Sequence, residues 1–102
     1  MSQLEKLKLM LGIKPEDDSQ DDAMELMLED AESDILTWTN RVELPASLES
    51  AQRQLVVVRY NKQGAEGETA HSEGGISRSF EDVPAGLQQT ILSKRLAKVA
   101  TY

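Results

Sequence analysis

The chain has 102 residues, of which 39% are hydrophobic, and its formal charge is −7. This length predicts a single small domain over residues 1–102, and the negative charge argues against a nucleic-acid binder, which neutralises phosphates with Lys and Arg. The lack of cysteine excludes disulfides and thiolate metal sites, and the N-terminus lacks the long apolar run of a signal peptide or membrane span.

The first predicted element is a short N-terminal helix over residues 2–12. Leu4, Leu7 and Leu11 follow helical spacing. Ser2 and Glu5 are placed as a capping box, and Gly12 is the expected end of the helix. About three turns are too few for a stable isolated helix, so this one is expected to dock. It docks either on its own domain or, as a flexible arm, on a neighbour.

A polar linker over residues 14–22 leads into the clearest helix, residues 22–39. Ser19 or Asp21 is the expected N-cap, and Asn40 is expected to end the helix in the left-handed conformation. Leu26 and Leu36 widen the apolar stripe, which predicts that the helix is covered on more than one side. The stripe itself consists of Met24, Met27, Leu28, Ala31, Ile35 and Trp38.

After a connection over residues 41–47, residues 46–63 form the second long segment, with Gly64 as its expected end. Its apolar register favours a helix with Arg59 on the outer side, although the valines at 56–58 are also compatible with a strand. Each valine costs only about 0.5 kcal/mol of helix propensity, which packing overrides. The register residues are Leu48, Ala51, Leu55 and Val58.

Residues 64–80 hold four of the six glycines and the only histidine. No apolar periodicity runs through them, which predicts a loop that meets a partner, in part as an added edge strand. The alternative is a surface loop in which Phe80 folds back as an anchor. The candidate partner-binding residues here are Gly67, Glu68, His71, Glu73, Gly74, Gly75, Ile76, Ser77, Arg78 and Phe80.

The same loop offers no recognisable chemistry for catalysis. His71 has no cysteine or second histidine with which to share a metal ion. No nucleophile elbow, ordered triad or phosphate-cradling glycine pattern surrounds it. The sequence therefore predicts neither an enzyme nor a bound cofactor or metal.

A last helix is predicted over residues 84–98, with Asp82 as its cap and Pro84 at its start. Basic residues near its C-terminal end complement the helix dipole. Together with Tyr102 they form the second group of candidate partner-binding residues, which consists of Lys94, Arg95, Lys98 and Tyr102.

Charge is distributed unevenly along the chain. Residues 1–34 carry eleven acids against three lysines, whereas residues 84–102 carry three basic residues and no acid. Unlike ends suit head-to-tail or ring contacts between copies. Two solvated faces of a monomer are the alternative.

Together these elements predict an all-α fold. It is a small helical bundle of about three to four helices, with a long glycine-rich loop over residues 64–83 before the last helix. The C-terminal helix and tail occupy residues 84–102.

Four stretches carry a family resemblance: MELMLEDAESDILTWTNR at 24–41, LP at 44–45, VVVRYNKQGAEGETAHSEGGISRSF at 56–80 and VPAGLQQTILSKRLAKV at 83–99. In this order they resemble the head–tail connector (head completion or adaptor) proteins of long-tailed siphophages. The resemblance covers nearly the whole chain and depends on the combined order of the stretches, not on any single motif.

The resemblance implies a structural protein without enzymatic activity, whose copies assemble as a ring, twelvefold like the portal, below the phage portal protein. The ring extends the DNA channel, through which double-stranded DNA passes without specific binding, and is the platform for the stopper or tail-completion protein. The implied location is the virion, with assembly in the host cytoplasm and no membrane partner.

Two questions about surfaces and function stay open at this point. Residues 94–102 are expected to reach an acidic portal surface, while the acidic N-terminal third faces a neighbour, the stopper or the channel. The alternative function is a generic small helical interaction or regulatory module.

Overall fold

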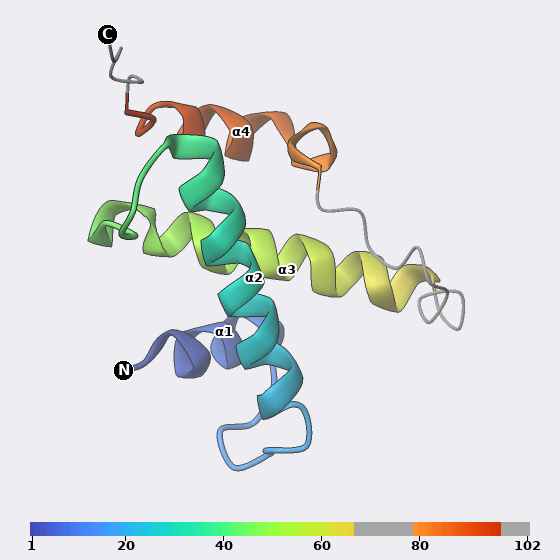
Figure 1. The fold of residues 1–102 in the computed structure, drawn as a ribbon. Helices are drawn as coiled ribbons and strands as arrows, with labels where there is room; N and C mark the ends of the chain where they lie inside the picture. The colour runs from blue at the N-terminus through green and yellow to red at the C-terminus, as the bar shows by residue number, and fades with distance from the viewer. Residues whose placement is uncertain (67–78, 97–102) are drawn as a thin grey trace, which may run out of the picture.

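The computed structural model describes residues 1–66 and 79–96 (Figure 1). Within these residues the chain is helical and contains no strand, so the predicted all-α fold is confirmed. The centre of the predicted glycine-rich loop, residues 67–78, lies outside the described part. The helices are α1 (Gln3–Leu11), α2 (Asp21–Thr39), α3 (Glu49–Glu66) and α4 (Ala85–Leu92), with short 3₁₀ helices η1 (Ala46–Leu48) and η3 (Phe80–Asp82).

The two long helices form the scaffold. Figure 1 shows α3 crossing α2, with α1 beside the N-terminal half of α2 and α4 at its C-terminal end. Both short helices contact α2 and α3. All four helices therefore share one core, whose buried apolar residues are Leu7, Met24, Leu28, Ala31, Ile35, Leu48, Ala51, Leu55, Val56, Val83, Leu87 and Ile91.

The N-terminal helix forms as predicted. Glu5 donates its backbone N–H to Ser2 Oγ at 3.1 Å, and the Ser2 backbone N–H donates to Glu5 Oε1 at 2.7 Å, which completes the capping box. Gly12 ends the helix with φ +74°. The side chain of Leu7 is fully buried. Of the two docking alternatives, this structure has α1 docked on its own domain.

The predicted N-cap of α2 is wrong. The cap position is Gln20, which makes no side-chain capping hydrogen bond. Ser19 Oγ instead donates to Asp17 Oδ1 at 2.7 Å, and Asp21 Oδ1 pairs with Lys8 Nζ at 2.7 Å. Ser19 and Asp21 each bind another side chain, and neither of them caps α2.

The C-terminal end of α2 and most of its buried stripe agree with the prediction. Asn40 ends the helix in the left-handed conformation, with φ 57°. The helix α2 contacts α1, α3 and α4, and its buried residues, Met24, Leu28, Ala31, Ile35 and Thr39, recur along one stripe. Leu26 nevertheless stays 58% exposed, so the stripe does not widen at that position.

The segment with three successive valines is helical, which settles the choice between helix and strand. The helix α3 continues through Gly64 to Glu66, so the expected end at Gly64 is wrong. A glycine costs only about 1 kcal/mol within a helix, which is too little to end it. The outward position expected for Arg59 is also wrong, because its side chain is buried and Nη2 pairs with Asp34 Oδ2 at 2.8 Å.

The last helix is shorter than predicted. It follows Pro84 and ends at Leu92 instead of residue 98. Asp82 does not cap it but lies in η3, which is capped by Ser79, whose Oγ accepts the Glu81 backbone N–H at 3.3 Å. The early end of α4 follows from the hydrogen bonds that the next residues make with the end of α2.

Candidate interaction surfaces

Three of the predicted partner-binding residues, Phe80, Lys94 and Arg95, belong to the described part of the chain. Phe80 is half-buried and meets Trp38 edge to face, with ring centroids 5.0 Å apart and an interplanar angle of 67°. Such a pair stabilises the contact beyond its buried area. Phe80 therefore anchors η3 to α2, which is the arrangement that the sequence offered as the alternative to partner binding.

The remaining candidates lie outside the described residues, and their role in partner binding stays a prediction. They are Gly67, Glu68, His71, Glu73, Gly74, Gly75, Ile76, Ser77, Arg78, Lys98 and Tyr102.

The end of α2 holds the chain that follows α4. The Leu96 backbone N–H donates to Thr39 O at 2.9 Å, and Asn40 Nδ2 donates to Leu96 O at 3.0 Å. Arg41 Nε donates to Lys94 O at 2.9 Å. We call Thr39, Asn40 and Arg41 the α2 corner, and residues 92–96 the C-terminal segment. These bonds draw the segment away from the helical path, which explains why α4 ends early.

The α2 corner forms hydrogen bonds with backbone groups of the C-terminal segment, and the charged side chains of the segment stay in solvent. Lys94 and Arg95 are both exposed, and neither forms an ion pair with a described residue. They are also the only two consecutive basic residues in the chain. The corner therefore presents a pair of adjacent cations to solvent, just beyond the end of α4 and not in its last turn.

A groove runs between α1, α2 and the beginning of α3. Three leucines and four glutamates line it, and no described Lys or Arg does. We call it the acidic groove, and its defining residues are Leu4, Leu28 and Leu44 with Glu25, Glu29, Glu32 and Glu49.

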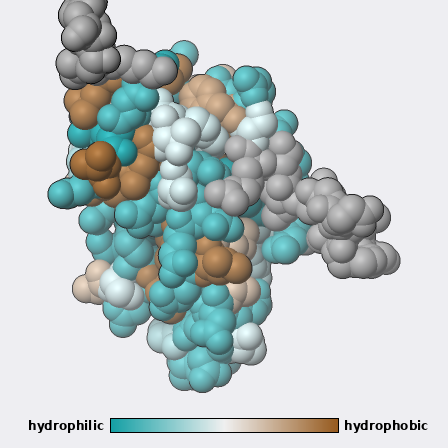
Figure 2. All heavy atoms as spheres, viewed as in Figure 1, coloured by the Kyte–Doolittle hydropathy of each residue, from teal (hydrophilic) through white to brown (hydrophobic). Residues whose placement is uncertain are grey.

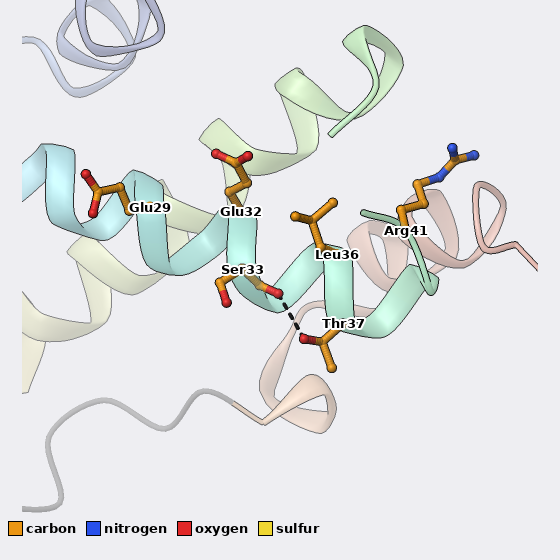
Figure 3. A pocket seen from close by; sticks show the side chains of 6 residues that line it. All are labelled: Glu29, Glu32, Ser33, Leu36, Thr37 and Arg41. Carbon is orange, nitrogen blue, oxygen red and sulfur yellow. Dashed lines mark hydrogen bonds between the residues drawn. The ribbon is translucent and has the colours of Figure 1, made fainter. Parts of the chain in front are cut away.

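An open hollow along α2 continues the acidic groove toward the α2 corner (Figure 3). The two share Glu29 and Glu32, and the hollow extends to Leu36 and Arg41. Figure 3 shows Glu32, Leu36 and Arg41 on the same side of α2. Along this side, two glutamates are followed by one leucine and then by the cation Arg41 just beyond the helix.

Glutamine side chains fix the walls of the groove. Gln3 Nε2 donates to Glu49 O at 3.0 Å and to Gln52 Oε1 at 2.8 Å, while Gln3 Oε1 accepts a bond from Arg53 Nη1 at 2.6 Å. Buried Gln52 donates through Nε2 to Leu28 O at 2.8 Å. Because these bonds join α1, α2 and α3, the groove has a defined shape without a bound partner.

Two buried ion pairs escaped the sequence analysis. The Lys8 and Asp21 side chains are 6% and 30% exposed, and those of Arg59 and Asp34 are 8% and 16% exposed. A usable signal was present, because each cation stands four residues after a leucine of its helix's apolar stripe. A charge within such a stripe requires a partner when it is buried.

Among the described residues, Glu5, Asp17 and Glu81 have a carboxyl pKa below the ordinary value, in each case because of hydrogen bonds with a nearby serine. The Ser2 backbone N–H lowers the pKa of Glu5, and the Ser19 hydroxyl lowers that of Asp17. The Ser79 hydroxyl does the same for the pKa of Glu81. None of these groups lies in the acidic groove, and the described residues contain no cluster of three or more His, Cys, Asp or Glu that would hold a metal ion.

Comparison with known proteins gives the family. The family model described as phage gp6-like head-tail connector protein matches residues 1–95, which include every described helix, the acidic groove and the α2 corner. No curated protein and no solved structure matches the chain. None of the described helices is long and apolar enough to cross a membrane. Because the match covers nearly the whole chain and agrees with the resemblance seen in the sequence, the chain belongs to the gp6-like head–tail connector family of phage proteins.

Proposed function

We propose that this protein is a head completion or adaptor protein, whose copies assemble as a ring below the portal protein. The ring extends the DNA channel and is the docking platform for the stopper or tail-completion protein. The observation that carries the proposal is the family match over residues 1–95, which gives the chain a structural connector role in the phage particle. A ring that continues the portal has the portal's twelvefold symmetry.

The distribution of charge supports assembly by unlike surfaces. One small domain carries the acidic groove near α1 and two exposed cations beyond α4. Contacts between different surfaces of identical copies generate closed rings when the rotation between copies closes. An acidic surface offers no phosphate contacts, so DNA passing through such a ring is not retained by it.

The test is to mix the protein with portal-bearing, DNA-filled heads and to count the bound copies by mass or imaging. We expect one ring at the portal vertex, and we expect the DNA to stay inside once the stopper protein is added. If heads whose portals accept an authentic connector bind no copies, the adaptor role is wrong. The chain then returns to the class of generic helical interaction modules.

The C-terminal tail is proposed to attach the ring to the portal. Removing residues 98–102 deletes Lys98 and Tyr102 without touching the described fold. We expect this truncation to weaken portal attachment at least tenfold, whereas the melting temperature stays within about 2 °C. Unchanged attachment would exclude the tail as the portal contact.

The glycine-rich loop is proposed to contact a ring neighbour or the portal. We expect peptides that cover residues 67–78 to gain protection from hydrogen exchange when the protein binds portal-bearing heads. If their exchange is the same in the free and bound protein, the loop is not a contact.

A further inference from the structure

We propose that the acidic groove of one copy receives the C-terminal segment, residues 92–96, of a neighbouring copy. This inference rests on the ring assembly proposed above and names the two surfaces that meet. It assigns Lys94 and Arg95 to the neighbour, and it leaves Lys98 and Tyr102 for the portal.

Charge is the first argument for this pairing. With a formal charge of −7, two copies repel each other as whole molecules, so a stable contact has to bring opposite charges together locally. The groove supplies four glutamates, and none of them forms an ion pair within the described residues. The segment supplies the chain's only consecutive cations, and neither of them forms an ion pair with a described residue. Each surface therefore carries the charge that the other lacks.

Apolar groups match as well. The segment exposes Leu92 by 44% and Leu96 by 46%, one on each side of its two cations. The groove is lined by three leucines between its glutamates. Figure 2 shows a largely hydrophilic face with separate hydrophobic groups, one of which lies at the upper left, near the C-terminal end of α2. Docking would remove these leucines from water while the cations reach the glutamates.

Both surfaces are held in place before they meet. The α2 corner fixes the backbone of the segment with three hydrogen bonds, and the Gln3–Gln52 network fixes the groove. A contact between preorganised surfaces loses little conformational entropy on binding. The exposed side chains of Lys94 and Arg95 are therefore presented in a fixed region of the surface.

The positions of the two surfaces permit a continuous assembly. The groove lies beside α1 and the N-terminal half of α2, whereas the segment lies at the C-terminal end of α2 (Figure 1). Because they are different surfaces, each copy can bind one neighbour through its groove and another through its segment. Such heterologous contacts close into a ring when the rotation allows it.

Cysteine crosslinking tests the contact directly, because the chain has no cysteine of its own. We would mix two single-cysteine variants, E29C in the groove and K94C in the segment, under mild oxidation on portal-bearing heads and in free solution. The mixture should form disulfide-linked dimers at least tenfold faster than either variant alone. The matched control replaces K94C with K62C, a cysteine at another exposed lysine. If the E29C and K94C mixture crosslinks no faster than this control in either setting, the proposal is overturned.

Reciprocal charge reversal tests the same contact without a crosslink. The variants K94E/R95E and E25K/E29K should each weaken association between copies at least tenfold, and mixing the two variants should restore it to within about threefold of wild type. The control K14E/K62E makes the same change in net charge as K94E/R95E at exposed positions away from both surfaces, and it should keep wild-type association. Circular dichroism confirms the fold of each variant. Failure of the mixture to recover overturns the pairing.

The experiments distinguish a failure of this inference from a failure of the proposed function. If complete rings form on portals while E29C and K94C do not crosslink, the protein is a connector whose copies meet through other surfaces. If a portal or stopper peptide crosslinks to E29C instead, the groove serves that partner and the proposal is wrong. If no copies bind the portal at all, the adaptor role itself fails.

Discussion

The two short helices of this bundle are fixed to the same scaffold in opposite ways. The cation Lys8 of α1 is buried, where Nζ contacts Asp21 Oδ1 at 2.7 Å and Pro15 O at 3.1 Å. The cations that follow α4, Lys94 and Arg95, are exposed, because the α2 corner holds only the backbone of their segment.

This difference separates a structural use of charge from one that is available to a partner. A buried cation that is paired with oxygens of its own chain is shielded from another molecule, and its removal destabilises the fold because the partner carboxylate is left unpaired. An exposed cation on a fixed backbone contributes little to stability and is free to bind. The predictions below test this contrast between the two ends of the bundle.

The largest effect is expected from truncating a buried apolar side chain, because each of the two short helices is anchored in the core by one. Leu7 in α1 and Ile91 in α4 are both fully buried. Replacing either by alanine should lower the free energy of unfolding by about 2–5 kcal/mol, because each change leaves a cavity. Urea denaturation measures this loss, with L9A as the control, since Leu9 is 61% exposed. A loss from L7A no larger than that from L9A would mean that α1 is not anchored in the core.

Neutralising the cations should change the free energy of unfolding by different amounts at the two ends of the bundle. K8M leaves the Asp21 carboxylate without its partner and should cost about 2 kcal/mol, less than a fully buried pair because that carboxylate is 30% exposed. K94M/R95M should change stability by less than about 0.5 kcal/mol. Urea denaturation of both variants gives the comparison. Equal losses would contradict the distinction between inward and outward charges.

A smaller and local effect is expected at the α2 corner. N40G keeps the left-handed conformation, which glycine adopts readily, but removes the bond from Asn40 Nδ2 to Leu96 O. One such bond is worth about 1 kcal/mol, so the Leu96 backbone N–H should exchange about fivefold faster. Hydrogen exchange followed by NMR measures this, and the Leu7 amide in α1 is the internal control. An unchanged rate at Leu96 would show that the side chain of Asn40 does not hold the segment.

The smallest effect is a pH dependence at the start of α1, which has no counterpart in the uncapped α4. Because the folded pKa of Glu5 is lowered, its contribution to stability is present above the ordinary glutamate value of about 4.3 and is lost as pH falls through the folded pKa. S2P removes the Ser2 N–H and hydroxyl at a compatible φ of −78°, so the pKa of Glu5 should rise toward its ordinary value. An NMR titration checks this, and an identical pKa in S2P would contradict the capping box as its cause.

Local patterns predicted the local features of the fold. The capping box of α1, the left-handed Asn40 and most of the buried stripe of α2 follow from residues that are near one another in sequence. Gly64 misled the prediction because a long helix tolerates one glycine. Leucines continue to residue 96, which extended the predicted last helix although the real one ends at Leu92.

The features that sequence reasoning missed depend on contacts between distant residues. Arg59 in α3 pairs with Asp34 in α2, and Gln3 in α1 forms a hydrogen bond with Gln52 in α3. In the α2 corner, Arg41 donates a hydrogen bond to the backbone oxygen of Lys94. The acidic groove likewise forms only when α1, α2 and α3 come together, so the sequence predicted an acidic N-terminal third without its shape.

The most direct test of this account is a high-resolution image of the protein assembled on portal vertices. The account predicts a closed ring in which Lys94 and Arg95 of each copy lie against the acidic groove of the next, while Lys8 stays paired with Asp21 inside each copy. A ring whose grooves are empty, or portal vertices that remain bare, would contradict it.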